Sequence, residues 1–599
     1  MKKTLFAVLT CMMVMATQAQ WSLSGNSISS GDFLGTTNSQ DLIFKRNGFL
    51  SGFIGTTSTS FGYQTLPLSS SGVNNCAFGT NVLSSNTTGS NNTGFGYGSL
   101  VNNTTGSGNV AIGNAALQDN STGSENVAIG NQALAFCQSG FANVAIGRES
   151  LRENYYGSYN VANGYYAMSE SSEGNYNTAI GSWSLGNNYN GSNNTGIGFS
   201  SLYSNYMGFS NVALGTHTLY NNQYGHNLVA IGDSALYNQT THSAGNYFST
   251  AVGSKALFSN TTGGGNTGIG FNTLYSNALG DYNTALGNKA LFSTTGSNNT
   301  AAGNFAMMNN TTGAGNASFG SGSMTDNTTG GGNVGFGSGA LNGNATGNSN
   351  VAVGYAARFS SSFSYSTVVG SLALIRESNC TALGAYAQTA TGGYNATAIG
   401  FLAATTTSDQ VRIGNTSVSD IGGYANWTNL SDARTKKNIQ SNVPGLIFIN
   451  KLNPVTYNLD LGAAEKIISS EERTLSPAEM TSRKLKEATI QTGFIAQEVE
   501  KAAAAINYNF SGVKKAMNEK DLYGLRYAEF VVPLVKSVQE LSAENDQKNK
   551  TIADLTIKID QMQGQINDIL LQLKKANGSS IVKAPVLVKP NKAYLDTNK

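Results

Sequence analysis

The stretch "NVAIGNAAL" at Asn109–Leu117 is followed by "NVAIGNQAL" at Asn126–Leu134 and by "NVAIGRESL" at Asn143–Leu151. The three copies begin 17 residues apart. The glycine that closes each unit recurs from Gly62 to Gly414, first in steps of 17 and later with small slips. Self-similarity at a fixed period of this length indicates a repeat architecture, in which each unit stacks on its neighbours.

Each unit carries the pattern of a short β-strand. In Val110-Ala111-Ile112 the two outer residues share one face and Ala111 takes the other, which is a period of two. Gly113 permits a bend that a residue with a Cβ resists, and Leu117 supplies a second apolar anchor. The connecting segments, such as "NNTTGSGN", are rich in turn-forming residues. The fold class predicted is therefore mostly β, a parallel β-solenoid of about 17-residue repeats.

Roughly 22 turns at the spacing of hydrogen-bonded strands give a rod on the order of 100 Å long. Stacked asparagine side chains can hydrogen-bond from turn to turn and would account for the many asparagines. Glycosylation at the N-x-T sequences is the alternative explanation. A phosphate-binding loop at Gly263, "GGGNTGIGF", is disfavoured because the same glycine spacing recurs in every turn rather than opening one helix.

The N-x-A-x-G units resemble the head repeat of trimeric autotransporter adhesins of the YadA type, over most of residues 62–414. The resemblance implies a left-handed parallel β-roll, three chains side by side, and a host-cell or matrix ligand that the sequence does not identify. The step is longer here than in that family, which implies longer external loops. Those adhesins end in membrane-anchoring strands, and such strands are not expected here because the last residues are the polar "KPNKAYLDTNK".

Met1–Gln20 has the pattern of a secretory signal peptide, with a basic start, an apolar stretch and small residues before the cleavage point. We therefore expect an exported protein, either secreted or on the cell surface. No run of about 18 apolar residues follows Gln20, so no transmembrane segment is expected in the mature chain.

The composition also narrows the class of protein. The formal net charge of +2 gives no electrostatic case for a nucleic-acid partner. The cysteines that follow Gln20 are Cys76, Cys137 and Cys380, an odd number at wide spacing that predicts neither a disulfide framework nor a metal site. No cofactor is expected. No proline falls between Pro67 and Pro444.

Beyond the repeats the sequence becomes ordinary and charged, and it contains several blocks in a fixed order. The blocks are "WTNLSDARTKKNIQ", "LIFINKLNPVTYNLD" at Leu446–Asp460, a charged helical stretch near Ser476–Ala488, "TGFIAQEVEKA" at Thr492–Ala502 and "YGLRYAEFVVPLVKSVQEL" at Tyr523–Leu541. This succession resembles the endosialidase-type intramolecular chaperone domain found at the C-terminus of phage tail spikes, and the resemblance spans about 429–544. It implies a domain that trimerises, templates the folding of the β-rod before it, and then severs itself with a serine–lysine dyad.

Carried over by position, the resemblance implies Ser431 as the nucleophile and Lys436 as the base, with Asp432 and Arg434 as supporting residues. The chemistry of the residues agrees. The three histidines all lie in the repeats, so a Ser-His-Asp triad at Ser431 is disfavoured. A lysine serves as a base when burial or nearby positive charge lowers its pKa from about 10.4. Lys437 and Arg434 are expected to supply that charge, and a trimer interface the burial.

The bond expected to break joins Leu430 to Ser431, because the hydroxyl reaches the Leu430 carbonyl through a five-membered ring. Attack from a neighbouring chain removes this ring argument, and cleavage between Ser431 and Asp432 is then the alternative. A third interpretation remains for "SDARTKK" taken alone: a basic, polar stretch is usually a solvated connector.

The last helix carries an apolar seam with alternating steps of three and four. Its members are Val531, Leu534, Val538, Leu541, Ile552, Leu555, Ile559, Met562, Ile566, Ile569 and Leu573, with Asn545 and Lys548 in the two intervening seam positions. This pattern predicts a coiled coil, and Ile at both seam positions favours three or more strands. A single amphipathic helix folded onto its own domain is the alternative.

The sequence thus predicts an exported homotrimeric β-rod with a self-cleaving C-terminal folding chaperone, an α+β domain that ends in a long trimeric coiled-coil helix. The expected boundaries are a signal peptide at 1–20, an N-terminal β segment at 21–61, repeats at 62–414, a linker at 415–430, the chaperone and autopeptidase domain at 431–544, a coiled coil at 545–575 and a flexible tail at 576–599. Two other classes stay open. One is a structural or adhesive fibre that keeps its C-terminal domain. The other is an ice- or carbohydrate-binding solenoid acting through its Thr and Asn rows.

Overall fold

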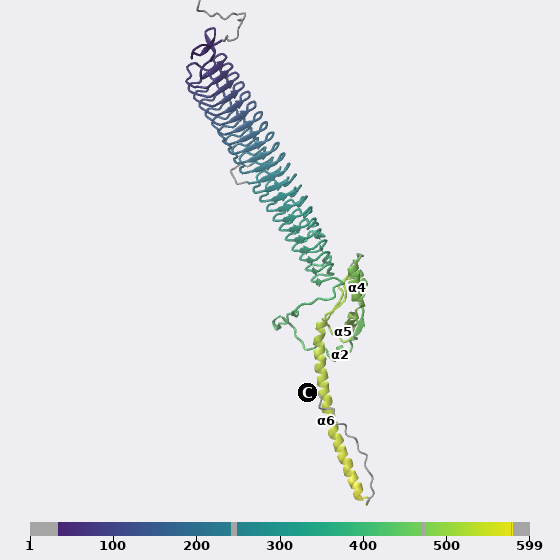
Figure 1. The fold of residues 1–599 in the computed structure, drawn as a ribbon. Helices are drawn as coiled ribbons and strands as arrows, with labels where there is room; N and C mark the ends of the chain where they lie inside the picture. Colours follow the sequence, from purple (N-terminus) through teal and green to yellow (C-terminus); the bar gives the residue numbers. More distant parts are fainter. Residues whose placement is uncertain (1–33, 241–247, 469–473, 577, 579–599) are drawn as a thin grey trace, which may run out of the picture. The chain divides into compact units, whose positions relative to one another are not determined.

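The structure, a computed structural model, describes residues 34–240, 248–468, 474–576 and 578. The predicted signal peptide at 1–20 lies outside the described residues, as does the predicted tail apart from Ala576 and Gly578. The chain divides into two compact units between Ile413 and Gly414. The first unit is a long β-solenoid, and the second combines short helices and strands with one long helix (Figure 1).

The solenoid begins with an antiparallel hairpin. Strand β1 (Leu42–Arg46) pairs with β2 (Phe49–Ile54) across a tight turn at Asn47 and Gly48, both of which have positive φ. Strand β2 then pairs antiparallel with β3 (Thr59–Phe61), and β3 pairs parallel with the strand that follows it. The hairpin therefore covers the first edge of the parallel ladder, which is otherwise open to pairing with another chain.

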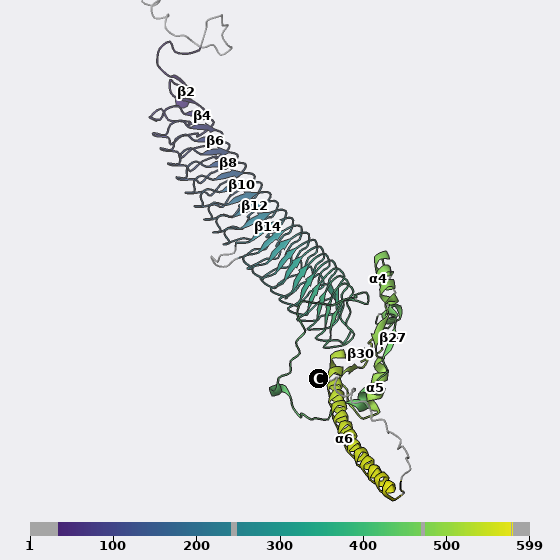
Figure 2. The same ribbon diagram turned by 60° about the horizontal axis from the view of Figure 1, so that its bottom comes forward.

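From β3 onward the strands of the 24-stranded sheet are parallel, and each pairs with the next in register (Figure 2). The strands after β3 are β4 (Cys76–Phe78), β5 (Thr93–Phe95), β6 (Val110–Ile112), β7 (Val127–Ile129), β8 (Val144–Ile146), β9 (Val161–Asn163), β10 (Thr178–Ile180), β11 (Thr195–Ile197), β12 (Val212–Leu214), β13 (Val229–Ile231), β14 (Thr250–Val252), β15 (Thr267–Ile269), β16 (Thr284–Leu286), β17 (Thr300–Ala302), β18 (Ala317–Phe319), β19 (Val334–Phe336), β20 (Val351–Val353), β22 (Thr367–Val369), β24 (Thr381–Leu383), β25 (Thr397–Ile399) and β26 (Val411–Ile413). Two further short strands, β21 (Arg358–Phe359) and β23 (Leu374–Ile375), pair parallel with one another.

The predicted alternation within each strand is confirmed. Ala111 is fully buried while Val110 and Ile112 face outward, and Leu117 is buried as the second apolar anchor. Gly113 has a φ of 141°, and a Cβ there would overlap the carbonyl oxygen of Gly130 in the next turn. The closing glycine is therefore required both by backbone conformation and by the close approach of successive turns.

The sequence did not reveal a second bend in each turn. Ala115 and Leu117 also have positive φ, at 54° and 52°, although a residue with a Cβ disfavours this region. The amide of Leu117 donates to the carbonyl of Ala133 in the next turn at 2.9 Å. Hydrogen bonds to the neighbouring turn hold the left-handed residues in place, and a pattern of residue types does not show such bonds.

The expected asparagine ladders are present in the core. The backbone amide of Asn126 donates to Asn109 Oδ1 at 3.0 Å, and Asn126 Nδ2 donates to the Gly140 carbonyl at 2.8 Å. Both asparagines are fully buried. Their side chains satisfy backbone groups of the turns, which would otherwise be buried without partners. The handedness of the solenoid stays a prediction.

The second unit begins at Gly414. Its elements are the 3-10 helix η1 (Ala433–Thr435), α2 (Leu446–Ile449), β27 (Val455–Tyr457), α3 (Leu461–Ile468), α4 (Pro477–Ala488), β28 (Gln491–Gly493), α5 (Ala496–Ala504), β29 (Val513–Lys514), β30 (Gly524–Leu525), the 3-10 helix η2 (Tyr527–Phe530) and α6 (Val531–Ala576). Strands β27 and β28 form one antiparallel pair, and β29 and β30 form another. The unit is therefore α+β, as predicted.

Helix α6 is 46 residues long and is continuous through the point where the coiled coil was expected to begin. No helix in the described part of the chain is long and apolar enough to cross a membrane.

Candidate active site

The predicted nucleophile and base lie on one tight turn near the start of the second unit. Asp432 caps the 3-10 helix η1, because its Oδ1 accepts a hydrogen bond from the backbone amide of Arg434 at 2.9 Å. The Thr435 amide and hydroxyl both donate to the Asp432 carbonyl, at 3.1 and 2.8 Å, and the Lys436 amide donates to the Ala433 carbonyl at 3.1 Å. These bonds reverse the chain between Asp432 and Lys436.

The reversal brings Lys436 back onto Ser431. Lys436 Nζ donates a hydrogen bond of 2.7 Å to Ser431 Oγ. This is the distance expected when a base is placed to take the proton of a hydroxyl nucleophile. The two residues that the sequence comparison paired are thus in direct contact, and their catalytic roles stay a prediction.

The two predicted supporting residues form a forked ion pair. Arg434 Nε lies 3.1 and 3.0 Å from the two carboxylate oxygens of Asp432, and Arg434 Nη2 lies 2.6 Å from Oδ2. The Arg434 guanidinium lowers the pKa of Asp432 below its ordinary range, and the carboxylate raises the pKa of Arg434 in return. The charge of Arg434, which was expected to act on Lys436, is therefore offset by Asp432. The ion pair between Asp432 and Arg434 stabilises the turn.

The whole turn is open to solvent in the single chain. Ser431 and Lys436 are exposed, and Leu430, whose carbonyl is the expected target, is 99 % exposed. Within the described part of the chain, no residue provides the burial that was expected to help Lys436.

The free cysteines do not offer an alternative nucleophile. Cys76, Cys137 and Cys380 are unpaired in the described part of the chain and lie within the solenoid. Burial raises the pKa of the Cys137 thiol to about 12, and burial also raises the pKa of Cys76 and Cys380. Their thiols stay protonated near neutral pH, so they are poor nucleophiles.

Three of the sequence blocks supply residues to one aromatic core in the second unit. Phe448 from α2, Phe510 and Phe530 are buried and contact one another in sequence, with ring centroids 4.9 and 4.8 Å apart. Phe494, from the "GFIAQEV" block, stacks on Phe530 at 5.4 Å. Gly493 precedes it, and a Cβ there would overlap the hydroxyl of Tyr527. These three blocks are separated in the sequence and pack into the same core.

Two contacts that tie this unit together were not foreseen from the sequence. Glu540 Oε2, on α6, accepts a hydrogen bond of 2.7 Å from the Leu446 amide at the start of α2. Lys514 Nζ pairs with the buried carboxylate of Asp521 at 2.7 Å. The first contact joins residues 94 positions apart, and only the fold brings them together.

The segments Leu461–Ile468 and Pro477–Ala488 form the helices α3 and α4. Ser476 caps α4 with a full capping box completed by Glu479, so the predicted charged helix is present. Arg483 of α4 forms an ion pair with Glu465 of α3. Lys486 donates to the carbonyls of Thr416 and Val418, both at 2.6 Å. Helix α4 thereby holds the chain that leads from Gly414 toward the Ser431 turn.

Comparison with known families agrees with this arrangement. Residues 431–507 match the model of the family described as chaperone of endosialidase, and the match begins at Ser431 itself. A search of the curated proteins found no match. The matched segment covers the turn, α2, α3, α4 and α5, while Phe510 and the η2 residue Phe530 extend the same aromatic core beyond it. A chaperone of endosialidase domain therefore follows the β-solenoid in this chain, an order typical of fibre-like proteins.

Proposed function

We propose that the chain is an exported, homotrimeric fibre whose C-terminal domain templates assembly and then separates itself by a serine–lysine reaction at Ser431. The observation that carries the proposal is the 2.7 Å hydrogen bond between Lys436 Nζ and Ser431 Oγ. The match of residues 431–507 to the chaperone of endosialidase family supports it, since that family is known for self-cleavage.

The reaction follows from the geometry of the turn. An unprotonated Lys436 accepts the Ser431 hydroxyl proton, and Oγ attacks the carbonyl carbon of Leu430 through a five-membered ring. The proton then passes to the Ser431 nitrogen as the carbon–nitrogen bond breaks, leaving Leu430 as an ester on the serine side chain. Water hydrolyses the ester, so the products are a solenoid that ends in the Leu430 carboxylate and a domain that begins with the free amine of Ser431.

Helix α6 supports the trimer. The apolar residues of the predicted coiled-coil seam are between 45 and 64 % exposed in the single chain. An apolar stripe of this length is stable in water only when another helix covers it. Ile559, Ile566 and Ile569 place β-branched side chains at both seam positions, and this favours three strands over two.

The solenoid presents a second apolar face that fits the same assembly. The outer residues of successive strands align in register, as in Phe95, Ile112, Ile129 and Ile146, which are 36 to 40 % exposed. The polar Asn163 follows Ile146 in this row, and the apolar ridge before it marks an interaction surface rather than a solvated one. Three solenoids packed along their ridges would cover it, and the register of α6 would set the register of the ridges.

Assembly and cleavage are coupled in this proposal. The dyad is exposed in the single chain, whereas a lysine base needs a desolvated or positively charged setting. Covering of the turn by neighbouring chains supplies that setting only after three chains have met. The solenoid then loses its template once it is folded, which removes the route back to the unfolded chain.

The test is a cleavage assay on the full-length chain without its first 20 residues, with light scattering to measure assembly. We expect Ser431→Ala and Lys436→Met to form trimers and stay whole, with cleavage at least about 100-fold slower than in the wild type. Lys437→Met, one residue further on, is the matched control and should cleave normally. Cleavage of the Lys436→Met trimer at the wild-type rate would refute the dyad. If the wild-type chain forms trimers and is not cleaved, the protein is instead a fibre that keeps its C-terminal domain.

Export is part of the proposal and rests on the signal-like pattern of Met1–Gln20. The mass of the protein recovered outside the cell would test it, because removal of the signal leaves a chain that begins just after this segment. Recovery of the protein only inside the cell, with Met1 still present, would contradict export.

A further inference from the structure

Over four successive turns of the solenoid, the same position carries a tyrosine in three turns and a serine in one. The residues that follow the buried asparagine or its equivalent in successive turns are Tyr155, Ser172, Tyr189 and Tyr206. Backbone hydrogen bonds place them in this order, since the Ser172 amide donates to the Tyr189 carbonyl at 2.9 Å and the Asn190 amide donates to the Tyr206 carbonyl at 3.0 Å. Ser172 is thus a gap of one ring in a row of tyrosines.

The intact part of the row shows what the gap lacks. The rings of Tyr189 and Tyr206 stack with centroids 5.2 Å apart and planes only 7° from parallel. Tyr155 and Tyr189 lie two turns apart, which at the spacing of hydrogen-bonded strands is roughly 9.6 Å. A flat group midway between Tyr155 and Tyr189 would lie about 4.8 Å from each. This is close to the 5.2 Å between the stacked rings of Tyr189 and Tyr206.

The gap is a cavity on the solenoid surface. Its volume is about 370 Å³, and its lining includes Tyr155, Ser172, Tyr189 and Tyr206 together with Glu153, Glu170 and Asn187. Ser172 is 8 % exposed, so its small side chain forms the floor. Aromatic walls with a few polar groups at the rim are typical of a ligand site.

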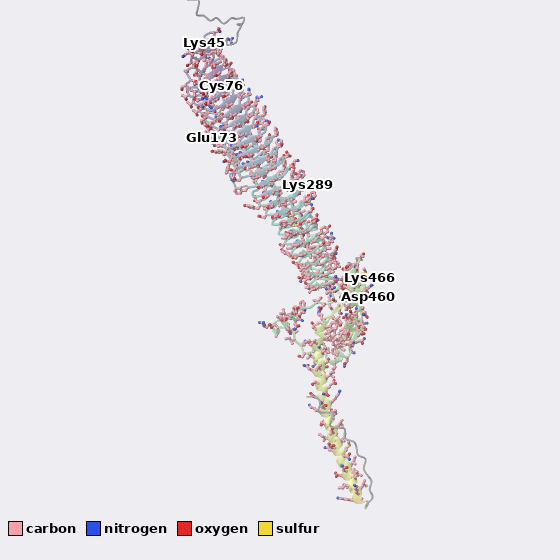
Figure 3. The ribbon with its side chains drawn as sticks, in the orientation of Figure 1. Lys45, Cys76, Glu173, Lys289, Asp460 and Lys466 are labelled. Carbon is pink, nitrogen blue, oxygen red and sulfur yellow. The ribbon has the colours of Figure 1, made fainter. Side chains whose placement is uncertain are left out.

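The rim is acidic in a solenoid that has few charges. Glu153 is already paired with Arg152, at 2.5 Å. Glu170 is exposed, and the described residues offer it no ion pair. Glu173 directly follows Ser172 and lies on the outer surface of the solenoid (Figure 3). The cavity therefore has at least one carboxylate available to a positively charged ligand.

We propose that this cavity binds a planar cation, the guanidinium group of an arginine side chain on a partner protein. A guanidinium stacks on tyrosine faces, is weakly hydrated, and pairs with a carboxylate through two parallel hydrogen bonds. A lysine ammonium has the charge without the flat shape, and a neutral sugar ring has the shape without the charge. The site lies in the solenoid, so it does not depend on cleavage at Ser431.

The probe for the test is N-acetyl-arginine amide, titrated calorimetrically into the assembled full-length Ser431→Ala protein at low salt. The filling variant is Ser172→Tyr, which completes the row with the residue already present at positions 189 and 206. We expect Ser172→Tyr to lower the affinity at least tenfold and Glu170→Gln to lower it several-fold. Glu125→Gln, an exposed carboxylate elsewhere on the solenoid, is the matched control and should bind as the parent does.

Three outcomes would overturn the proposal: no binding of the probe at millimolar concentrations, equal binding to the Ser172→Tyr protein, or equal binding of the uncharged N-acetyl-citrulline amide. Binding of a neutral disaccharide in place of the arginine probe would also overturn it, and would assign the cavity to carbohydrate. Tyr189→Ser, which removes one wall rather than filling the gap, keeps the test valid if the Ser172→Tyr chain fails to fold, and we expect it to weaken binding as well.

Discussion

The side-chain amide of Asn120 donates a hydrogen bond of 2.7 Å to Asn103 Oδ1, one turn earlier in the solenoid. The next position in this ladder is Cys137, whose thiol contacts the Gly140 carbonyl at 3.5 Å. A cysteine has no amide to offer, and Asn120 Oδ1 has no hydrogen-bond partner in the described part of the chain. The ladder is therefore interrupted at Cys137, and Asn154 Oδ1, which precedes Ser171 in the same ladder, also has no hydrogen-bond partner in the described residues.

Cys137→Asn should repair the ladder. A new amide at this position can donate to Asn120 Oδ1, and satisfying a buried acceptor adds about 1 kcal/mol to the free energy of unfolding. Thermal unfolding of the solenoid measures the gain, with Cys137→Ala as the control that adds no donor. A Cys137→Asn chain no more stable than the alanine variant would show that the unpaired oxygen carries no cost.

Gly113 tests the close approach of successive turns. Gly113→Ala places a Cβ against the Gly130 carbonyl at a φ of 141°, so we expect a loss of about 2–4 kcal/mol and faster hydrogen exchange in the adjacent turns. Gly98→Ala is the matched control. Its φ is 66°, no atom lies within 4 Å of the added Cβ, and the equivalent residue of the next turn is Ala115. Equal losses at both positions would contradict this account of the closing glycine.

The seam of α6 should set the oligomeric state. In a trimer, Ile559→Lys places one positive charge from each of the three chains in the middle of the predicted interface. We therefore expect the trimer to dissociate at concentrations at least tenfold higher than for the parent chain. Sedimentation of the Ser431→Ala chain, which cannot lose its helix by the proposed reaction, makes the measurement. Gln561→Lys lies on the same helix at an outward c position of the heptad and should leave the assembly unchanged. Trimers of unaltered stability in the Ile559→Lys chain would argue for a helix that packs elsewhere.

The Asp432–Arg434 pair gives the turn a dependence on pH. The folded pKa of Asp432 lies below its unfolded value. The ion pair therefore stabilises the turn fully at pH values above the unfolded pKa of an aspartate, and this stabilisation is lost as the pH falls through the folded pKa. Carbon-13 NMR of aspartate carboxyls in the Ser431→Ala chain, assigned with Asp432→Asn, should show the low pKa. Arg434→Gln should return the pKa toward its ordinary value. An ordinary pKa for Asp432 in the chain that keeps Arg434 would mean that the ion pair between them does not form in solution.

The solenoid was predictable because its information is local and repeated. The alternation in Val110-Ala111-Ile112, the closing glycine and the buried asparagines each recur at a fixed step, so one turn predicts the next. The left-handed conformation of Leu117 was not predictable, since hydrogen bonds to the following turn hold it there. Residue type alone argues against that conformation.

The catalytic roles of Ser431 and Lys436 stay a prediction, whereas the structure does show how these side chains lie. The order of the sequence blocks identified Ser431 and Lys436, and the structure brings them into contact. The pairing of Arg434 with Asp432 was missed, although both residues were named, because sequence proximity to Lys436 does not say which partner a guanidinium takes. The cap on α2 by Glu540 was missed because it joins distant segments.

The intact mass of the purified chain, expressed without residues 1–20, tests the central claim most directly. We expect the wild type to give two masses, one for a solenoid that ends at Leu430 and one for a domain that begins at Ser431, while Ser431→Ala gives a single full-length mass. A domain that begins at Asp432 would instead indicate attack on the carbonyl of Ser431, by a neighbouring chain. A single full-length mass for both proteins would contradict self-cleavage and leave a fibre with its C-terminal domain attached.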